Sequence, residues 1–152
     1  MSVIEIKNLS VDFTVDGKPV HAVKDSSLTI KEGETFGLVG ESGSGKSVTS
    51  LAIMGLLPKP QAKISSGEIL YKGKNILNFS KKEMTQIRGN KITMIFQEPM
   101  TSLNPVFKIG NQITETILLH QEVSKNEAKE RAIQLLDEVG IPDPERKFDD
   151  YP

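Results

Sequence analysis

The sequence predicts an α/β fold, and three observations carry that prediction. Apolar and polar residues alternate over 3–13, which is typical of a strand, and a second extended run covers 20–30. A short apolar run over 35–39 leads into a glycine-rich stretch and then a helical pattern. From Ile109 onward, apolar residues recur with helical spacing. β-rich sequence therefore comes before about residue 108, and α-rich sequence follows it.

The first two strands are expected to pair as an antiparallel ribbon. Residues 3–13 alternate with one slip near Asn8, and Asp16-Gly17 then supplies turn chemistry. The second run, 20–30, ends in another turn at 31–34. A turn between two extended runs favours a hairpin.

The run over 35–39 is expected to form a strand buried on both faces, because nearly all its residues are apolar. After the glycine-rich stretch, the pattern predicts an apolar helix from about Lys46 to Leu57, ended by Pro58 and Pro60. The segment therefore predicts a strand, a loop and a helix in succession.

Three shorter elements are expected next. Residues 67–76 predict a hairpin that turns at Gly73. Residues 80–88 predict a short helix opened by a capping box, which is a Ser followed three residues later by a Glu. Residues 91–96 predict a second core strand, which runs into a polar loop with two prolines.

The last third of the chain predicts helices. Ile113, Ile117 and Leu118 are expected to share one face of the first. A second capping box, Ser124 with Glu127, opens another helix that Gly140 is expected to end. The apolar residues of that helix are Ala128, Ala132, Leu135, Leu136 and Val139.

Composition excludes several classes of protein. With 19 basic and 20 acidic side chains, the net charge of -1 gives no electrostatic case for binding nucleic acid. The lack of cysteine excludes disulfides, thiol catalysis and Cys-ligated metals in this segment. His21 and His120 are far apart in sequence and are expected to be structural. No apolar run approaches the roughly 18 residues that a membrane span needs.

One motif carries chemistry. The segment Gly40-Glu41-Ser42-Gly43-Ser44-Gly45-Lys46-Ser47 matches the phosphate-binding pattern Gly-x-x-x-x-Gly-Lys-Ser/Thr. Its glycines let backbone N–H groups point at a phosphate, and the following helix adds its positive N-terminus. Lys46 is expected to reach the β- and γ-phosphates, and the Ser47 hydroxyl to coordinate Mg²⁺. An accidental Gly/Ser loop is the alternative, but the expected strand before the motif and helix after it favour nucleotide binding.

Other candidates are weaker on their residues alone. Gln97 closes an expected strand where open α/β sheets place ligand-contacting residues, although exposed glutamines are more often solvated. Phe13 lies on the ribbon, where an aromatic residue more often belongs to the core. Asp137 and Glu138 follow an apolar run, as the acidic pair of an ATPase does. They fall within an expected helix, however, and are expected to be solvated.

The order of these motifs resembles the ATP-binding subunits of ABC transporters, specifically the branch that imports dipeptides, oligopeptides or nickel. The resemblance runs through the whole chain, from Phe13 and the motif Gly40–Ser47 to Phe96-Gln97-Glu98-Pro99-Met100-Thr101-Ser102-Leu103-Asn104-Pro105 and the final Phe148-Asp149-Asp150-Tyr151-Pro152. It implies a P-loop NTPase core of the ABC ATPase type, with an N-terminal antiparallel β subdomain, over residues 1–108. Residues 109–152 would begin an α-helical subdomain whose surface receives a helix of the permease.

The resemblance assigns roles to residues. Phe13 would stack on adenine, and Gln97 would contact Mg²⁺ and the attacking water and sense the transmembrane subunit. Lys46 and Gln97 would take part in catalysis, and Ser47 and Gln97 would hold Mg²⁺. The residues expected to bind ATP are Phe13, Gly40, Glu41, Ser42, Gly43, Ser44, Gly45, Lys46, Ser47 and Val48.

The resemblance also implies an assembly on the cytoplasmic face of the cell membrane. A second ATP-binding subunit, identical or different, would close with this one on ATP and drive the transmembrane permease subunits. An extracytoplasmic substrate-binding protein would take part indirectly, and no nucleic acid would be involved. Hydrolysis of ATP would reset the closed pair.

In the family, the sequence corresponding to Tyr151-Pro152 comes just before the Ser-Gly-Gly signature, and the acidic strand and switch histidine come later. The chain is therefore expected to be the truncated N-terminal portion of a longer ATPase and to hydrolyse ATP negligibly by itself. It is also expected to self-associate through an uncovered apolar sheet edge or face. Alternatives are a nickel importer of the same branch, a nucleotide-binding fragment without hydrolysis, and another P-loop ATPase.

Overall fold

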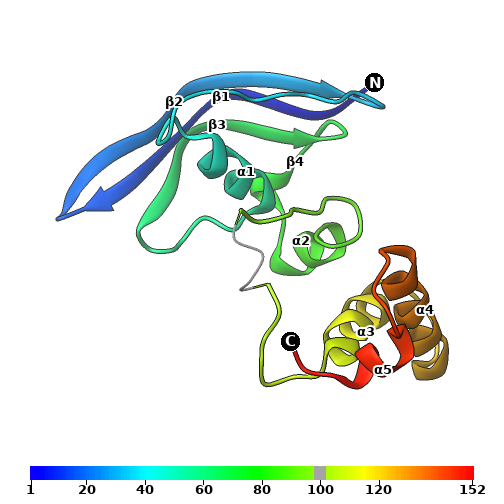
Figure 1. Ribbon diagram of the computed structural model, residues 1–152. Coiled ribbons are helices and arrows are strands. Elements are labelled where there is room, and N and C mark those ends of the chain that lie inside the picture. Colours follow the sequence, from blue (N-terminus) through cyan, green and yellow to red (C-terminus); the bar gives the residue numbers. More distant parts are fainter. Residues whose placement is uncertain (98–101) are drawn as a thin grey trace. The chain divides into compact units, whose positions relative to one another are not determined.

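The computed structural model describes residues 1–97 and 102–152. These residues group into two compact units, Met1–Arg88 and Gly89–Pro152. The first unit contains all the strands of the described chain, and the second is helical (Figure 1). The expected division at residue 108 into a nucleotide-binding core and a helical subdomain stays a prediction.

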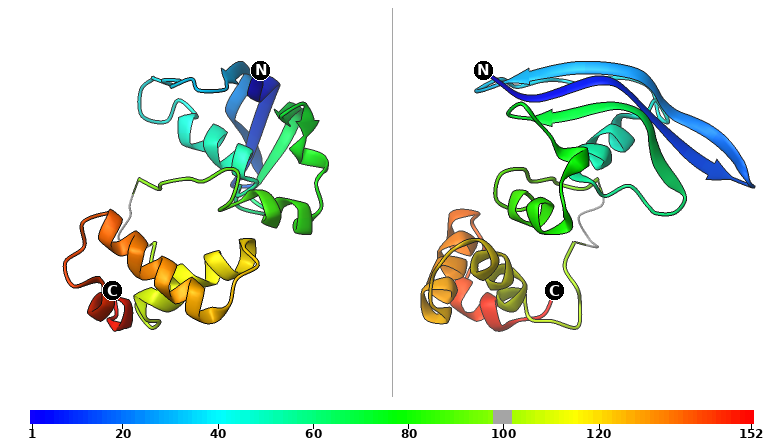
Figure 2. Two further views of the ribbon diagram at one scale, coloured as in Figure 1. Left: turned by 90° about the vertical axis from the view of Figure 1, so that its right-hand side faces the viewer. Right: turned by 180° about the vertical axis from the view of Figure 1, so that it is seen from behind.

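The first unit is built on a four-stranded sheet with the strand order β2-β1-β3-β4. Its antiparallel strands are β1 (Ser2–Val15), β2 (Lys18–Lys31), β3 (Ala62–Tyr71) and β4 (Lys74–Asn75). The expected ribbon is confirmed, because β1 and β2 pair along their whole length and turn at Asp16-Gly17, where φ is 49° and 75°. β3 pairs with β1 only as far as Phe13, so the ribbon continues beyond it as a two-stranded arm (Figure 2).

The slip near Asn8 is a β-bulge that is matched by a second bulge on β2. Asn8 and Asp25 both adopt the left-handed conformation, with φ of 48° and 47°, and the register shifts on either side of the pair Leu9↔Ser26. The Asn8 side-chain amide donates a 2.8 Å hydrogen bond to Asp25 Oδ1. On β3, a Cβ at Gly67 would lie 2.6 Å from the Asn8 carbonyl oxygen. Glycine is therefore required where β3 passes the bulge.

Helix α1 (Lys46–Met54) lies against one face of the sheet (Figure 1). Its Ala52 and Met54 are buried, together with the four largest fully enclosed side chains of the protein's described residues, Ile6, Leu9, Val11 and Ile69. Burial of these side chains from helix and strands supplies the core of the first unit.

Helix α2 (Lys81–Ile87) follows a 3₁₀ turn, η1 (Ile76–Asn78). Its expected capping box is present: Ser80 Oγ accepts a hydrogen bond from the Glu83 N–H, and Glu83 Oε2 accepts one from the Ser80 N–H. Arg88, directly after α2, donates hydrogen bonds of 2.6 and 3.0 Å to the two carbonyl oxygens at the end of α1. This arginine therefore ties α2 to α1.

The second unit contains α3 (Ile109–His120), α4 (Lys125–Glu138) and α5 (Pro144–Asp149). The capping box of Ser124 and Glu127 is also present. The helices enclose a small apolar core made of Ile117, Ala128, Ala132, Leu136 and Phe148. Gly110 contacts this core so closely that an added Cβ would meet the Phe148 ring at 2.5 Å. A side chain at position 110 would therefore displace the aromatic ring.

Two expected core strands are wrong. Residues 35–39 and 91–96 form no strand, and several of their apolar side chains are exposed: Val39 is 89% exposed and Ile95 is 93% exposed, whereas Ile92 and Met94 are half-buried. The apolar composition of both runs is real. A strand, however, also needs a neighbouring strand to complete its hydrogen bonds, and within the described residues neither run has one.

Three helical expectations also need correction. Helix α1 ends at Met54 rather than Leu57, because Gly55 adopts the left-handed conformation (φ 61°) and its N–H caps the helix. Leu118 is 39% exposed because it lies five residues after Ile113, which rotates it away from the core face. Val139 is 72% exposed because it is the C-cap of α4 and lies past the last turn.

Gly140 ends α4 as expected, with φ of 77°. Helix α5 was not expected, since Pro142 and Pro144 indicated irregular chain. Pro144 instead occupies the first turn of α5, where its missing N–H costs nothing. Among the helices of the described residues, none has the length and apolar character needed to cross a membrane.

Candidate functional site

The glycine-rich motif forms a loop between residues 35–39, which belong to no helix or strand, and the start of α1. Gly43 and Gly45 have φ of 82° and 89°, which side-chain-bearing residues rarely adopt. A Cβ at Gly45 would lie 2.6 Å from the Ala22 carbonyl oxygen on β2, and one at Gly40 would lie 2.6 Å from Ser44 Oγ. Glycine is thus required both for the curl of the loop and for its contact with β2.

Lys46 folds back over the loop that precedes it. Its ammonium group donates hydrogen bonds to the carbonyl oxygens of Gly40 and Glu41, both at 2.7 Å, and to Ser44 Oγ at 3.2 Å. The side chain is half-buried, and its charge lies over residues 40–44. This arrangement places a cation beside a glycine-rich loop of the kind that binds anions.

The N-terminus of α1 is electrostatically uncompensated. Its N-cap, Gly45, provides no side-chain hydrogen bond, and the first turn has no acidic residue. Thr49 Oγ1 donates a 2.9 Å hydrogen bond to the Gly45 carbonyl oxygen and is itself buried. The first turn of α1, with Ser47 exposed and Val48 half-buried, therefore offers free backbone N–H groups and a positive dipole end to an anion.

A pocket of about 260 Å³ lies beside this loop. One wall comes from β2 and the other from the end of the extended run, the loop and α1. Its lining residues are Ala22, Val23, Lys24, Ser26, Leu38, Val39, Ser44, Gly45, Lys46 and Thr49. Lys24 and Ser26 of this set were not anticipated from the sequence, because no motif marks them.

Phe13 is half-buried on β1, with Val20 and Ala62 as its cross-strand partners. It does not line the pocket. Two residues earlier on the same face of β1, Val11 pairs with Val23, which does line it. The structure therefore places Phe13 on the pocket's side of the ribbon, and adenine stacking stays a prediction.

Gln97 is exposed and belongs to the second unit, at the end of the first described stretch. The rest of its expected loop, residues 98–101, lies outside the described residues. Its roles in catalysis and Mg²⁺ binding therefore stay predictions.

Residues 23–152 match the sequence profile of the ABC transporter family. The chain belongs to this family. The oligopeptide transport ATP-binding protein OppD of Bacillus subtilis (strain 168) is 50% identical over 149 residues, which cover 98% of this chain and 42% of OppD. The dipeptide transport ATP-binding protein DppD of the same strain is 49% identical over 150 residues, covering 99% of this chain and 45% of DppD.

The ABC transporter fold has a solved counterpart. The ATP-binding cassette MJ0796, in a dimeric post-hydrolysis structure bound to ADP and Pi, is 28% identical to this chain. The two superpose with a TM-score of 0.80 over 98% of this chain and 61% of that one. The expected fold class and the resemblance to the peptide-import branch are both confirmed. The chain spans less than half the length of OppD and DppD.

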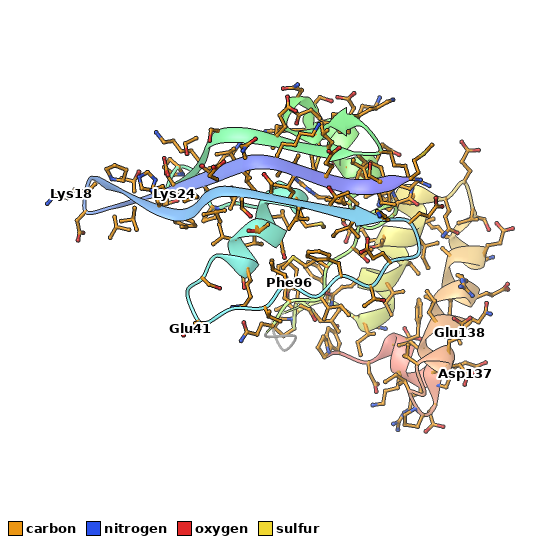
Figure 3. The ribbon with its side chains drawn as sticks, turned by 90° about the horizontal axis from the view of Figure 1, so that it is seen from above. Lys18, Lys24, Glu41, Phe96, Asp137 and Glu138 are labelled. Atoms are coloured by element: carbon orange, nitrogen blue, oxygen red, sulfur yellow. The ribbon has the colours of Figure 1, made fainter. Side chains whose placement is uncertain are left out.

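The acidic residues that follow an apolar run, as the acidic pair of an ATPase does, lie in a helix, as the helical pattern indicated. Asp137 and Glu138 are exposed in the last turn of α4 (Figure 3). Glu138 accepts a 3.0 Å hydrogen bond from Arg131 Nη1 on the same helix. The expectation that both residues are solvated is confirmed.

The two histidines differ in their surroundings. His21 lies across the ribbon from Asp12, with Nδ1 of the ring 2.6 Å from Asp12 Oδ1. Their pairing could have been found only from the register of β1 and β2, because nine residues separate them. His120 lies in the last turn of α3, and its Nδ1 is buried with no partner among the described residues.

Proposed function

We propose that this chain is part of the ATP-binding subunit of an ABC importer that takes up dipeptides or oligopeptides. The observation that carries the proposal is the loop at 40–47, which combines strained glycines, an inward-facing lysine and an uncompensated helix N-terminus. Its setting in a chain of the ABC transporter family supports ATP as the ligand. The names of OppD and DppD favour peptides over nickel as the cargo.

In this proposal the phosphate chain of ATP binds against the loop and the first turn of α1. Backbone N–H groups from Gly40 to Val48 donate to phosphate oxygens, and the Lys46 ammonium moves from the loop carbonyls to the β- and γ-phosphates. The Glu41, Ser42 and Ser44 backbones contribute to the same cradle. Phe13 stacks on the base.

A magnesium ion fits the residues at the start of α1. Ser47 is exposed and its hydroxyl forms no hydrogen bond among the described residues, so an oxygen ligand is available to a hard cation. We propose Ser47 and Gln97 as its protein ligands. When bound, the ion would neutralise charge on the phosphates.

The helical unit is proposed to contact the permease. A hollow of about 510 Å³ on this unit has a mixed lining of Ser102, Leu103, Gln112, Ile113, Glu115, Thr116, Ile117 and Leu135. A lining that combines apolar and polar side chains suits an amphipathic helix of a partner. A second ATP-binding subunit is proposed by likeness to the dimeric cassette MJ0796. Such an assembly would lie on the cytoplasmic face of the membrane.

Calorimetric titration of the 152-residue chain with MgATP tests the central claim. The natural chain should release heat on binding, and Lys46→Ala should weaken binding at least about tenfold, since charge-assisted hydrogen bonds to phosphate are lost. Lys18→Ala, at the exposed tip of the ribbon, is the matched control and should bind as the natural chain does. Absence of binding by the natural chain at high protein concentration would contradict the proposal.

Contact with the permease needs a separate experiment. Purified transmembrane subunits of a dipeptide importer, held in detergent, should retain the natural chain, and Thr116→Arg should reduce retention by filling the hollow. Leu119→Arg, on an exposed part of α3 that does not line the hollow, is the control. Equal retention of the natural chain and Thr116→Arg would contradict this assignment.

A further inference from the structure

Lys24 forms part of the β2 wall of the pocket beside the phosphate loop. Of the ten residues that line this pocket, two are lysines, Lys24 and Lys46, and none is acidic. Lys24 is exposed, and its ammonium forms no hydrogen bond or ion pair with the residues that the structure describes. The lining of the pocket therefore includes a second lysine in addition to the one in the motif.

The double bulge of the ribbon determines where Lys24 lies. β1 advances by two residues from Leu9 to Val11, while β2 takes three to pass from Ser26 to Val23. The extra residue breaks the alternation of the strand, and bulges of this kind redirect side chains. Because β2 is the edge strand of the sheet, its outer side is free to meet the loop. Lys24 thus reaches the pocket from an edge position.

The carboxylate next to Lys24 is engaged elsewhere. Asp25 accepts a 2.8 Å hydrogen bond from the Asn8 amide, and its own N–H donates to Ser10 Oγ at 3.1 Å. These two contacts hold Asp25 toward β1 rather than toward Lys24. The positive charge of Lys24 is therefore left for the pocket.

We infer that Lys24 is a nucleotide-binding residue that contacts the phosphate chain from the side of the pocket opposite α1. The inference rests on the proposed function, because it concerns the same ligand. Two ammonium groups and a helix N-terminus around a pocket without carboxylates match a polyphosphate better than a neutral or singly charged ligand. Lys46 belongs to the phosphate-binding motif, whereas Lys24 lies at a β-bulge and belongs to no recognised motif.

The test compares two lysines of the same strand (Figure 3). Lys24→Gln keeps the length of the side chain and removes its charge. Lys18→Gln makes the same change at the tip of the ribbon, away from the pocket lining. Dissociation constants are measured by calorimetry on the 152-residue chain for two probes, MgATP and inorganic tripolyphosphate. Thermal unfolding checks that each variant remains folded.

Lys24→Gln should weaken both probes by about tenfold, as expected for the loss of one charge-assisted contact. Lys18→Gln should leave both affinities unchanged, and Lys24→Arg should restore most of the lost affinity. If Lys24→Gln binds MgATP as tightly as the natural chain does, while Lys46→Ala binds it more weakly, the inference would be overturned and the proposed function would stand. Loss of MgATP affinity without loss of tripolyphosphate affinity would overturn the assignment to the phosphates. Failure of the natural chain to bind either probe would overturn the proposed function, and the inference with it.

Discussion

Asp12 and His21 are direct cross-strand partners, and Oδ1 of Asp12 lies 2.6 Å from Nδ1 of His21. Asp12 is 8% exposed, whereas the side chain of His21 is 63% exposed. The hydrogen bond from His21 is the main cause that lowers the pKa of Asp12 below 3.8, with Ser65 and Lys63 on β3 acting in the same direction. One residue further along β1 is Phe13. The pair therefore joins β1 to β2 beside the residue that is proposed to bind the base.

Stability in acid should depend on this pair. A carboxyl group with a lowered pKa in the folded state stabilises the fold fully above its unfolded value near 3.8, and loses that stabilisation as pH falls through the lowered pKa. In Asp12→Asn the free energy of unfolding should therefore fall less steeply below that pH than in the natural chain. Urea unfolding over a series of acidic buffers measures the slope.

A variant of the partner residue, His21→Ala, gives a second test of this pH effect. His21→Ala removes the largest cause of the lowered pKa, so it should also flatten the slope in acid. Four other carboxyl groups also have lowered pKa values: Glu83, Glu127, Asp149 and Asp150. Their contribution to the loss of stability in acid should be the same in the natural chain and in both variants. Identical slopes in the natural chain and Asp12→Asn would show that the pair does not stabilise the fold.

Local features of the structure could be predicted from the sequence, and features that depend on a partner segment could not. The turn at Asp16-Gly17 and the capping boxes at Ser80 and Ser124 are built from residues within a few positions of one another, and all three were expected. The runs at 35–39 and 91–96 have the composition of core strands, yet composition does not provide a neighbour to pair with.

The same distinction applies to the candidate site. The loop and Lys46 were expected, because their chemistry is contained in eight consecutive residues. Lys24 was missed because it reaches the pocket through a bulge whose hydrogen bonds involve Asn8 and Ser10, far away in sequence. Gln97 was proposed from its place after an expected strand and from the resemblance, and its role stays a prediction.

The contact between the loop and β2 should be essential for nucleotide binding. Gly45→Ala would place a Cβ 2.6 Å from the Ala22 carbonyl oxygen at a φ of 89°, so the loop must shift away from β2. The left-handed conformation alone costs a side-chain-bearing residue about 1–2 kcal/mol. We expect MgATP affinity to fall at least about tenfold, measured by calorimetry.

Gly37→Ala is the matched control for this effect. Gly37 precedes the loop by a few residues, its φ is not in the left-handed region, and an added Cβ there would meet no atom within 4 Å. Its MgATP affinity should equal that of the natural chain. Tight binding by Gly45→Ala would show that the loop does not need its present contact with β2.

The core of the helical unit should be sensitive to Gly110. An added Cβ would meet the buried Phe148 ring at 2.5 Å, and such overpacking usually costs about 1–3 kcal/mol. Alanine at this helical position also recovers about 1 kcal/mol of helix propensity, which leaves a net loss of about 1 kcal/mol when it is subtracted from the middle of that range. Denaturant unfolding followed by far-ultraviolet circular dichroism measures it.

Asn111→Ala, one residue later on α3, separates propensity from packing. Asn111 is exposed, so its replacement should change stability by no more than about 0.5 kcal/mol. A Gly110→Ala variant that is as stable as Asn111→Ala would show that the Phe148 ring can move without loss of packing.

Residues 36–39 should cause the chain to self-associate in solution. Phe36, Leu38 and Val39 are 41%, 45% and 89% exposed, on a segment that pairs with no strand among the described residues. An exposed apolar segment with unpaired N–H and C=O groups is a template for pairing with another chain. Light scattering at rising concentration should therefore give a mass above that of one chain, and Val39→Lys should return it toward the monomer.

Val139→Lys changes an exposed valine at the end of α4 and should leave the association as it was. A natural chain that stays monomeric at every concentration would show that residues 36–39 are not sufficient to bring two copies together.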